Sequence, residues 1–128
     1  MNAIFITVAI VILVYLLINK YNSRGIIQLG AEAARTMLGN KDTIVLDVRT
    51  PSEFKSGHIK GARLMPVQTL GSTMSELEQF KERQIVVYCH SGNRSSVACQ
   101  LLRKHGFTKV ANLRGGITSW QANNFPVV

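Results

Sequence analysis

The chain has 128 residues, with fifteen Lys or Arg against seven Asp or Glu and a net charge of +8. If an apolar N-terminal segment is set aside, about 100 residues remain, enough for one domain with a modest core. Two cysteines exclude a disulfide framework. A basic chain can attract anionic lipid, small anions or nucleic acid. Because Lys and Arg neither cluster nor interleave with aromatic residues, we expect no nucleic-acid partner.

The N-terminal segment is long and apolar. Residues 3–18 carry no charge, and as a helix they would span about 24 Å, somewhat less than the roughly 30 Å of a hydrocarbon core. A secretory signal is the alternative, but no charged region precedes the segment and no small-residue cleavage motif follows it. Lys20 and Arg24 flank only its C-terminal side, which predicts an outside N-terminus and a cytoplasmic domain. We expect a transmembrane anchor over residues 1–19 and a juxtamembrane linker over 20–26.

The rest of the chain, residues 27–128, alternates between helical and strand patterns. Helices are expected over residues 31–38, 51–55, 73–81, 97–105 and 117–121, and strands over 43–46, 63–65, 85–88 and 110–113. Thr50 and Glu53 form a capping box for the second helix, and Ser95 and Ser96 are cap-type residues ahead of the fourth. Continuous apolar strands that alternate with helices predict an α/β fold: a parallel sheet of about five strands covered by helices on both faces.

Chemistry-bearing residues follow three of these strands. Asp47, Cys89 and the segment Arg114-Gly115-Gly116 each come directly after a predicted strand. Ligands of open parallel sheets bind outside the carboxyl ends of the strands. We therefore expect these three segments to meet at one edge of the sheet.

Cys89 opens a loop that leads to Arg94 and into a helix. Only the thiolate is nucleophilic, and a free cysteine with a pKa of about 8.5 is only a few per cent ionised near neutrality. Inward-pointing backbone N–H groups, the helix N-terminus and the Arg94 charge all favour the thiolate. A decrease of about two pKa units requires roughly 2.7 kcal/mol, which these effects together can supply. A structural cysteine is the alternative, but we predict that Cys89 is the nucleophile.

The loop resembles the active-site loop of the rhodanese family of sulfurtransferases. The matching segment is Cys89-His90-Ser91-Gly92-Asn93-Arg94-Ser95. Three further signatures match in the family's order: Leu46-Asp47-Val48-Arg49 followed by Glu53-Phe54, then Gly57-His58-Ile59-Lys60-Gly61-Ala62, and finally Leu113-Arg114-Gly115-Gly116 ahead of Trp120. The resemblance covers roughly residues 27–128 and implies one rhodanese-like domain in which Cys89 carries a persulfide.

The resemblance also implies roles for the residues around Cys89. The expected substrate-binding cradle consists of Ser91, Gly92, Asn93, Arg94 and Ser95, with His90 at its rim. The expected supporting residues are Asp47, Arg49, Arg114, Gly115 and Gly116. We expect Asp47 and Arg49 to form a buried pair that braces the loops, although contact with substrate is the alternative.

Three other residues are expected to be structural or supporting. Glu53 is a partner for Arg49 or only a capping residue, and His58 and Trp120 are expected to be structural. The sequence shows neither a metal-binding cluster nor a dinucleotide glycine signature, so no cofactor and no metal are predicted.

Loop length favours sulfur transfer. Four residues separate Cys89 from Arg94, whereas the family's phosphatase-like relatives carry five. We predict a sulfurtransferase that moves sulfur from a small anionic donor such as thiosulfate to cyanide or a thiol acceptor, for which a thioredoxin-like protein is a candidate. A non-catalytic interaction or sensing module at the membrane is the second hypothesis, and a phosphatase or arsenate reductase is the third.

Overall fold

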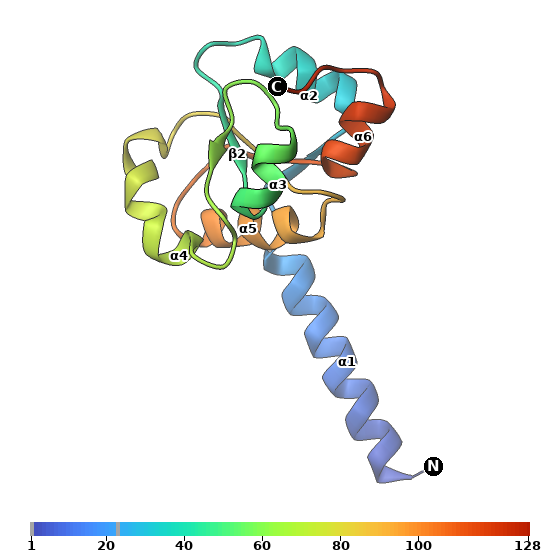
Figure 1. Cartoon of the computed structure of the whole chain (residues 1–128). Coiled ribbons are helices and arrows are strands. Elements are labelled where there is room, and N and C mark those ends of the chain that lie inside the picture. The colour runs from blue at the N-terminus through green and yellow to red at the C-terminus, as the bar shows by residue number, and fades with distance from the viewer. Residues whose placement is uncertain (1, 23) are drawn as a thin grey trace.

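The computed structural model describes residues 2–22 and 24–128. Helix α1 (Ala3–Asn22) projects from a compact α/β domain, with its described side chains exposed along its length (Figure 1). Residues Ala3–Tyr21 are long and apolar enough to cross a membrane, a property that an N-terminal signal sequence shares. Because α1 runs to Asn22, the first three residues of the predicted linker are helical; Ser23 lies outside the described residues.

The domain is built on one five-stranded parallel sheet with the order β1-β5-β4-β2-β3. Its strands are β1 (Ile26–Leu29), β2 (Ile44–Asp47), β3 (Arg63–Leu64), β4 (Ile85–Tyr88) and β5 (Val110–Leu113). The predicted parallel sheet is confirmed. Strand β1 was not among the predicted strands: it lies at the edge of the sheet, and the polar Gln28 interrupts its short apolar run.

Helices cover both faces of the sheet, as predicted (Figure 1). One face carries α2 (Ala31–Leu38) and α6 (Gly116–Ala122), and the other carries α4 (Leu70–Thr73), the 3₁₀ helix η1 (Met74–Phe80) and α5 (Asn93–Lys104). A short helix, α3 (Pro51–Ser56), follows β2. Side chains of β4 alternate between the two cores, with Ile85 and Val87 in one and Val86 and Tyr88 in the other.

Two predicted helices differ from those observed. The helix expected over 73–81 is α4 followed by η1, so most of it is 3₁₀. Helix α5 begins at Asn93 with Gly92 as its N-cap, and not at the predicted caps Ser95 and Ser96. Gly92 has φ 110° and ψ −11°, a left-handed conformation that turns the loop directly into the helix. The hydroxyls of the two serines instead donate to the Gly92 carbonyl from within the first turn.

Candidate active site

The carboxyl edge of the sheet brings together the segments that follow β2, β4 and β5. The Val48 N–H donates to the Tyr88 carbonyl at 3.1 Å, which joins the segment after β2 to the end of β4. The Ile117 N–H donates to the Cys89 carbonyl at 2.9 Å, which joins the segment after β5 to the residue that follows β4. Asp47 is the last residue of β2 and Cys89 follows β4 directly. The structure therefore places all three segments at one edge.

The Cys89 thiol lies at the base of its loop and is buried. The Gly92 N–H donates to its sulfur at 3.0 Å, and the thiol lies 3.4 Å from the Ser95 hydroxyl, to which it can donate. Burial by itself raises the pKa of Cys89, but hydrogen bonds from the Ser95 hydroxyl and from the backbone N–H groups of Ser95, Gly92 and Ser91 outweigh it. The net result is a pKa below the ordinary value of a cysteine. The loop geometry therefore favours the thiolate.

The Ser95 hydroxyl has one proton and two partners. In the structure it donates to the Gly92 carbonyl at 3.0 Å while its oxygen faces the Cys89 sulfur. Rotation of this hydroxyl would aim its proton at an ionised Cys89 instead. The side chain can therefore serve both protonation states of the thiol.

The second cysteine, Cys99, differs from Cys89 in the direction of its pKa shift. Cys99 is buried in α5, and burial raises its pKa to about 12. Both cysteines are free. Cys99 therefore stays a neutral thiol under ordinary conditions, and Cys89 is the one suited to nucleophilic chemistry.

Helix α6 fixes the loop from the side. The Thr118 N–H and hydroxyl both donate to the His90 carbonyl, at 3.2 and 3.0 Å, and Ile117 holds the Cys89 carbonyl as described above. Gly116 has φ 58°, and a Cβ atom at this position would collide with the carbonyl oxygens of Cys89 and His90. The absence of a side chain at Gly116 thus allows the start of α6 to approach the backbone of the Cys89 loop.

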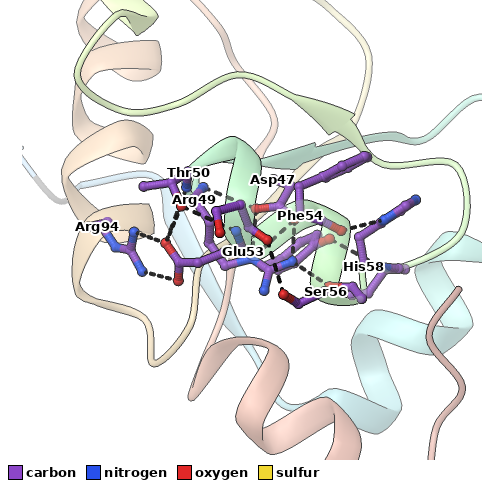
Figure 2. Close-up of polar contacts among 12 residues, drawn as sticks. Asp47, Arg49, Thr50, Glu53, Phe54, Ser56, His58 and Arg94 are labelled. Carbon is purple, nitrogen blue, oxygen red and sulfur yellow. Dashed lines mark hydrogen bonds and ion pairs between the residues drawn. The ribbon is translucent and has the colours of Figure 1, made fainter.

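Arg94 forms a bidentate ion pair with Glu53, at 2.7 and 2.9 Å (Figure 2). Glu53 also completes the predicted capping box of α3, since its carboxylate accepts from the Thr50 N–H and the Thr50 side chain accepts from the Glu53 N–H. The bond from Arg94 and the capping contacts lower the pKa of Glu53 from 4.5 to about 2. The predicted pairing of Glu53 with Arg49 is wrong: Glu53 is the partner of Arg94. The Glu53 carboxylate therefore partly compensates the positive charge of Arg94 that was expected beside Cys89.

Asp47 and Arg49 form the buried pair that the sequence predicts (Figure 2). The Arg49 guanidinium donates to both carboxylate oxygens of Asp47 at 2.7–3.1 Å, and it also donates to the Gly57 carbonyl at 2.7 Å. The two side chains are 0% and 5% exposed. The Asp47–Arg49 pair ties the end of β2 to the end of α3, the helix that carries Glu53. The pair can therefore support the Cys89 loop by fixing the backbone position of α3.

The remaining predicted residues divide between the rim and the scaffold. His90, Ser91 and Asn93 are exposed around the buried Cys89. Arg114 is exposed: its backbone N–H donates to the Leu29 carbonyl at the end of β1, and its guanidinium lies near Gly30 rather than in the contacts described around Cys89.

The residues expected to be structural lie in the scaffold. His58 stacks on Phe54 with ring centroids 3.7 Å apart, and Trp120 is part of the core.

Sequence reasoning missed two polar residues that support the loop, Asn112 and Thr118, and assigned Ser96 only a capping role. Asn112 donates to the Ser96 hydroxyl oxygen at 3.3 Å, and Ser96 in turn donates to the Gly92 carbonyl at 2.8 Å. One signal was readable in the sequence, because Asn112 is a polar residue inside the apolar strand 110–113. Nothing in the local pattern marks Thr118. Among residues 2–22 and 24–128, no three His, Cys, Asp or Glu side chains gather as a metal site would require.

The chain is thus a parallel α/β domain with a free cysteine cradled at the start of a helix. The pattern of the rhodanese-like domain family matches residues 30–123, so the chain belongs to that family.

Relatives and solved structures agree with the fold. A sulfurtransferase of Allochromatium vinosum is 38% identical over 95 residues, covering 74% of this chain and 87% of the relative. A rhodanese-related protein of Thermoplasma volcanium superposes with a TM-score of 0.71 at 32% identity, over 80% of this chain and 97% of that structure. The tRNA uridine(34) hydroxylase of Buchnera aphidicola is 32% identical over 96 residues, but this chain spans only 31% of its length.

Proposed function

We propose that the protein is a rhodanese-type sulfurtransferase that works through a persulfide on Cys89. The observation that supports this most is the sulfur's environment: a buried thiol that accepts from the Gly92 N–H and has a lowered pKa at the N-terminus of α5. The four-residue spacing between Cys89 and Arg94 encloses a small cradle. The name of the Allochromatium vinosum relative is consistent with the same chemistry.

In the first half-reaction the Cys89 thiolate attacks the outer sulfur of a donor such as thiosulfate. A bond forms between the two sulfurs, the donor's own sulfur–sulfur bond breaks, and sulfite leaves with the electron pair. Gly92 and Ser91 would stabilise the charged sulfur through their N–H groups, which lie on the loop that bends around it. Arg94, held by Glu53, would supply positive charge to the incoming anion.

In the second half-reaction an acceptor takes the outer sulfur. Cyanide or a thiolate attacks the persulfide, the bond to Cys89 breaks, and the Cys89 thiolate is restored. The reaction is ping-pong and needs neither metal nor cofactor. The exposed rim of His90, Ser91 and Asn93 is the surface that a thiol acceptor, for example a thioredoxin-like protein, would meet.

A non-catalytic sensing or docking module is the second proposal. The observation that favours it is the match to part of a tRNA uridine(34) hydroxylase, in which a segment similar to this domain belongs to a protein with a different named activity. Persulfide formation on Cys89 without turnover to any acceptor is the result expected of such a module.

We also propose that the domain works at the cytoplasmic face of a membrane. Support comes from α1, whose apolar stretch is followed by Lys20 and Arg24. The division into an anchor (1–19), a linker (20–26) and a rhodanese-like domain (27–128) stays a prediction.

The test compares two cysteine variants of the full-length protein. Cys89→Ser should abolish transfer of sulfur from thiosulfate to cyanide, because an alcohol cannot carry the persulfide, whereas Cys99→Ser should keep most of the activity. An intact-mass spectrum after thiosulfate treatment should show one added sulfur on the parent chain and on Cys99→Ser, and none on Cys89→Ser. Equal loss of activity in the two variants would show that Cys89 is not the nucleophile.

A further inference from the structure

A basic groove lies where the anchor helix meets the domain. It has a volume of about 640 Å³ and is lined by Tyr21, Arg24, Gly25, Gln100, Arg103 and Lys104. Figure 1 shows α5 on the side of the domain that α1 joins. The groove is therefore built from the end of α1, the turn after it and the C-terminal half of α5. No acidic side chain is among the residues that line it.

Hydrogen bonds fix α5 against the end of the anchor. The Gln100 side-chain amide donates to the Asn19 side chain at 3.3 Å, and the Arg103 Nε donates to the Arg24 carbonyl at 3.3 Å. A second guanidinium nitrogen of Arg103 donates to the carbonyls of Phe107 and Thr108, each at 3.1 Å. Arg103 therefore ties the juxtamembrane turn to the segment after α5. These hydrogen bonds fix the orientation of α5 relative to α1.

No ion pair among the described residues compensates the positive charge of the groove. Among the described residues, Arg24, Arg103 and Lys104 take part in none of the ion pairs, which involve other basic side chains. The position of the two α5 cations in the last helical turn also suits the helix dipole. That effect explains a preference for basic residues there, but it does not explain why Arg24 converges on the same groove.

The position of the groove along the membrane normal determines which layer of a bilayer it can contact. Ile18 is the last residue of the uncharged stretch. Helix α1 continues to Asn22, about 6 Å beyond Ile18 at 1.5 Å per residue, and the Arg24 N–H donates to the Tyr21 carbonyl. Tyr21 and Arg24 therefore lie at the headgroup layer of a bilayer that holds α1. Tyr21 is 69% exposed, and an exposed tyrosine is typical of this layer.

An exposed apolar side chain, Val97, lies closer to the N-terminus of α5. Val97, 58% exposed, lines a second groove together with Tyr15 and Ile18 of α1. Polar residues of both helices complete this second groove: Asn19, Asn93, Ser96 and Gln100. Along α5 the residues beside α1 thus change from apolar and uncharged polar to basic towards Lys104.

We propose that the Arg24–Arg103–Lys104 groove binds phosphate groups of anionic phospholipids in the membrane that holds α1. The proposal rests on the anchoring proposed above. Three cations that form no ion pair among the described residues lie at headgroup depth beside the anchor, and no acidic side chain lines their groove. This arrangement matches a layer of negative phosphates. Bound lipid would hold α5 against the bilayer, and with it the loop of Cys89 at the start of the same helix.

The experiment uses the full-length protein in nanodiscs that contain a nitroxide-labelled headgroup lipid. Nanodiscs of phosphatidylcholine alone are compared with nanodiscs that also contain phosphatidylglycerol. Broadening of backbone amide signals by the nitroxide should be stronger in phosphatidylglycerol for residues 24–25 and 97–104 than for α2. High salt should remove the difference, since the attraction is electrostatic.

Charge variants provide the decisive comparison. Arg24→Gln/Lys104→Gln should lose the phosphatidylglycerol-dependent broadening while Arg103 keeps its structural bonds. The matched control Lys41→Gln/Lys60→Gln removes the same charge from two exposed residues, one just after α2 and one beside the C-terminal segment. Figure 1 shows α2 and the C-terminus on the side of the domain away from α1, so this variant should retain the effect.

Equal broadening in both lipids, or equal loss in both variants, would overturn the lipid site while leaving the anchor intact. Full-length protein that stays outside nanodiscs of either composition would overturn the anchoring and this site with it. Sulfur transfer by the same samples reports on the proposed chemistry of Cys89 independently.

Discussion

One carboxylate, Glu53, connects the short helix α3 to the loop that surrounds Cys89. It accepts two bonds from Arg94 and a third from the Thr50 backbone. Both side chains of the ion pair are about one-third exposed, 31% for Glu53 and 33% for Arg94, so solvent screens part of the attraction. Bidentate geometry and the capping contacts nevertheless make the pair stronger than an isolated surface ion pair.

Glu53→Gln should destabilise the protein by about 1 kcal/mol at neutral pH, because glutamine keeps an acceptor oxygen but loses the charge. Folding lowers the pKa of Glu53 from 4.5 to about 2. A lowered carboxyl pKa stabilises the folded state above pH 4.5, and this stabilisation is lost as the pH falls through that range towards 2. Urea unfolding at pH 7 and near pH 3 measures the difference.

The difference between parent and Glu53→Gln should therefore shrink as the pH falls. Glu76→Gln is the control, since Glu76 is exposed in the first turn of η1, and it should change stability little at either pH. A Glu53→Gln effect of the same size at both pH values would show that the ion pair is not its source.

At the scale of single residues, the sequence predicts those parts of the site whose residues lie close together along the chain. Cys89 and its loop residues occupy one continuous segment, and Asp47 and Arg49 lie two residues apart. The partner of Arg94 lies 41 residues away, on a different helix. Its identity depends on how β2 and β4 pair, which no local pattern encodes.

At the scale of elements, the N-terminus of α6 packs directly on the Cys89 loop. Backbone N–H groups from its first turn hold the carbonyls of Cys89 and His90. This approach requires Gly116, which combines a positive φ with the absence of a side chain. The position of the nucleophile thus depends on a helix that contributes no reactive group.

Gly116→Ala should destabilise the domain by about 2 kcal/mol, because it adds both backbone strain and a collision with two carbonyls. The loop must move to relieve the collision, so sulfur transfer by the folded protein should fall on the order of a hundredfold. Thermal unfolding and steady-state assays measure the two effects.

The matched control for that substitution is Gly71→Ala in α4. A Cβ atom at Gly71 meets nothing within 4 Å, and alanine favours a helix over glycine by about 0.5–1 kcal/mol. This variant should be as stable as the parent or slightly more so, with unchanged activity. Full activity in folded Gly116→Ala would mean that α6 does not position the loop.

The elements that sequence could predict are those with buried apolar runs. Strands 85–88 and 110–113 and helix 31–38 have the predicted bounds because their patterns and stop signals are local. Strand β1 depends on pairing with β5 and has only one buried residue, Leu29, so its own sequence is uninformative. The buried residues of the 3₁₀ helix η1, Met74, Leu77 and Phe80, recur every three residues, which is the 3₁₀ period. A run of only three such positions is too short to distinguish this period from the α-helical one.

At the scale of the whole molecule, one question is which side of the membrane Cys89 faces. Helix α1 is exposed along its length, while the domain buries its own core independently of α1. In the proposed arrangement, α1 determines where the domain is located and, through its contacts with α5, how the domain is oriented. Because Lys20 and Arg24 follow the apolar stretch, we predict that the domain faces the cytoplasm.

The topology can be tested by labelling cells that express a Cys99→Ser variant, in which Cys89 is the one remaining thiol. A membrane-impermeant thiol reagent should label Cys89 only after the cells are opened. The control replaces both cysteines with serine and introduces Asn2→Cys at the other end of α1, where labelling of intact cells is expected. Because Cys89 is buried, each sample is also denatured after opening to measure its total thiol. Labelling of Cys89 in intact cells would reverse the predicted orientation, and recovery of the full-length chain in the soluble fraction would eliminate the anchor.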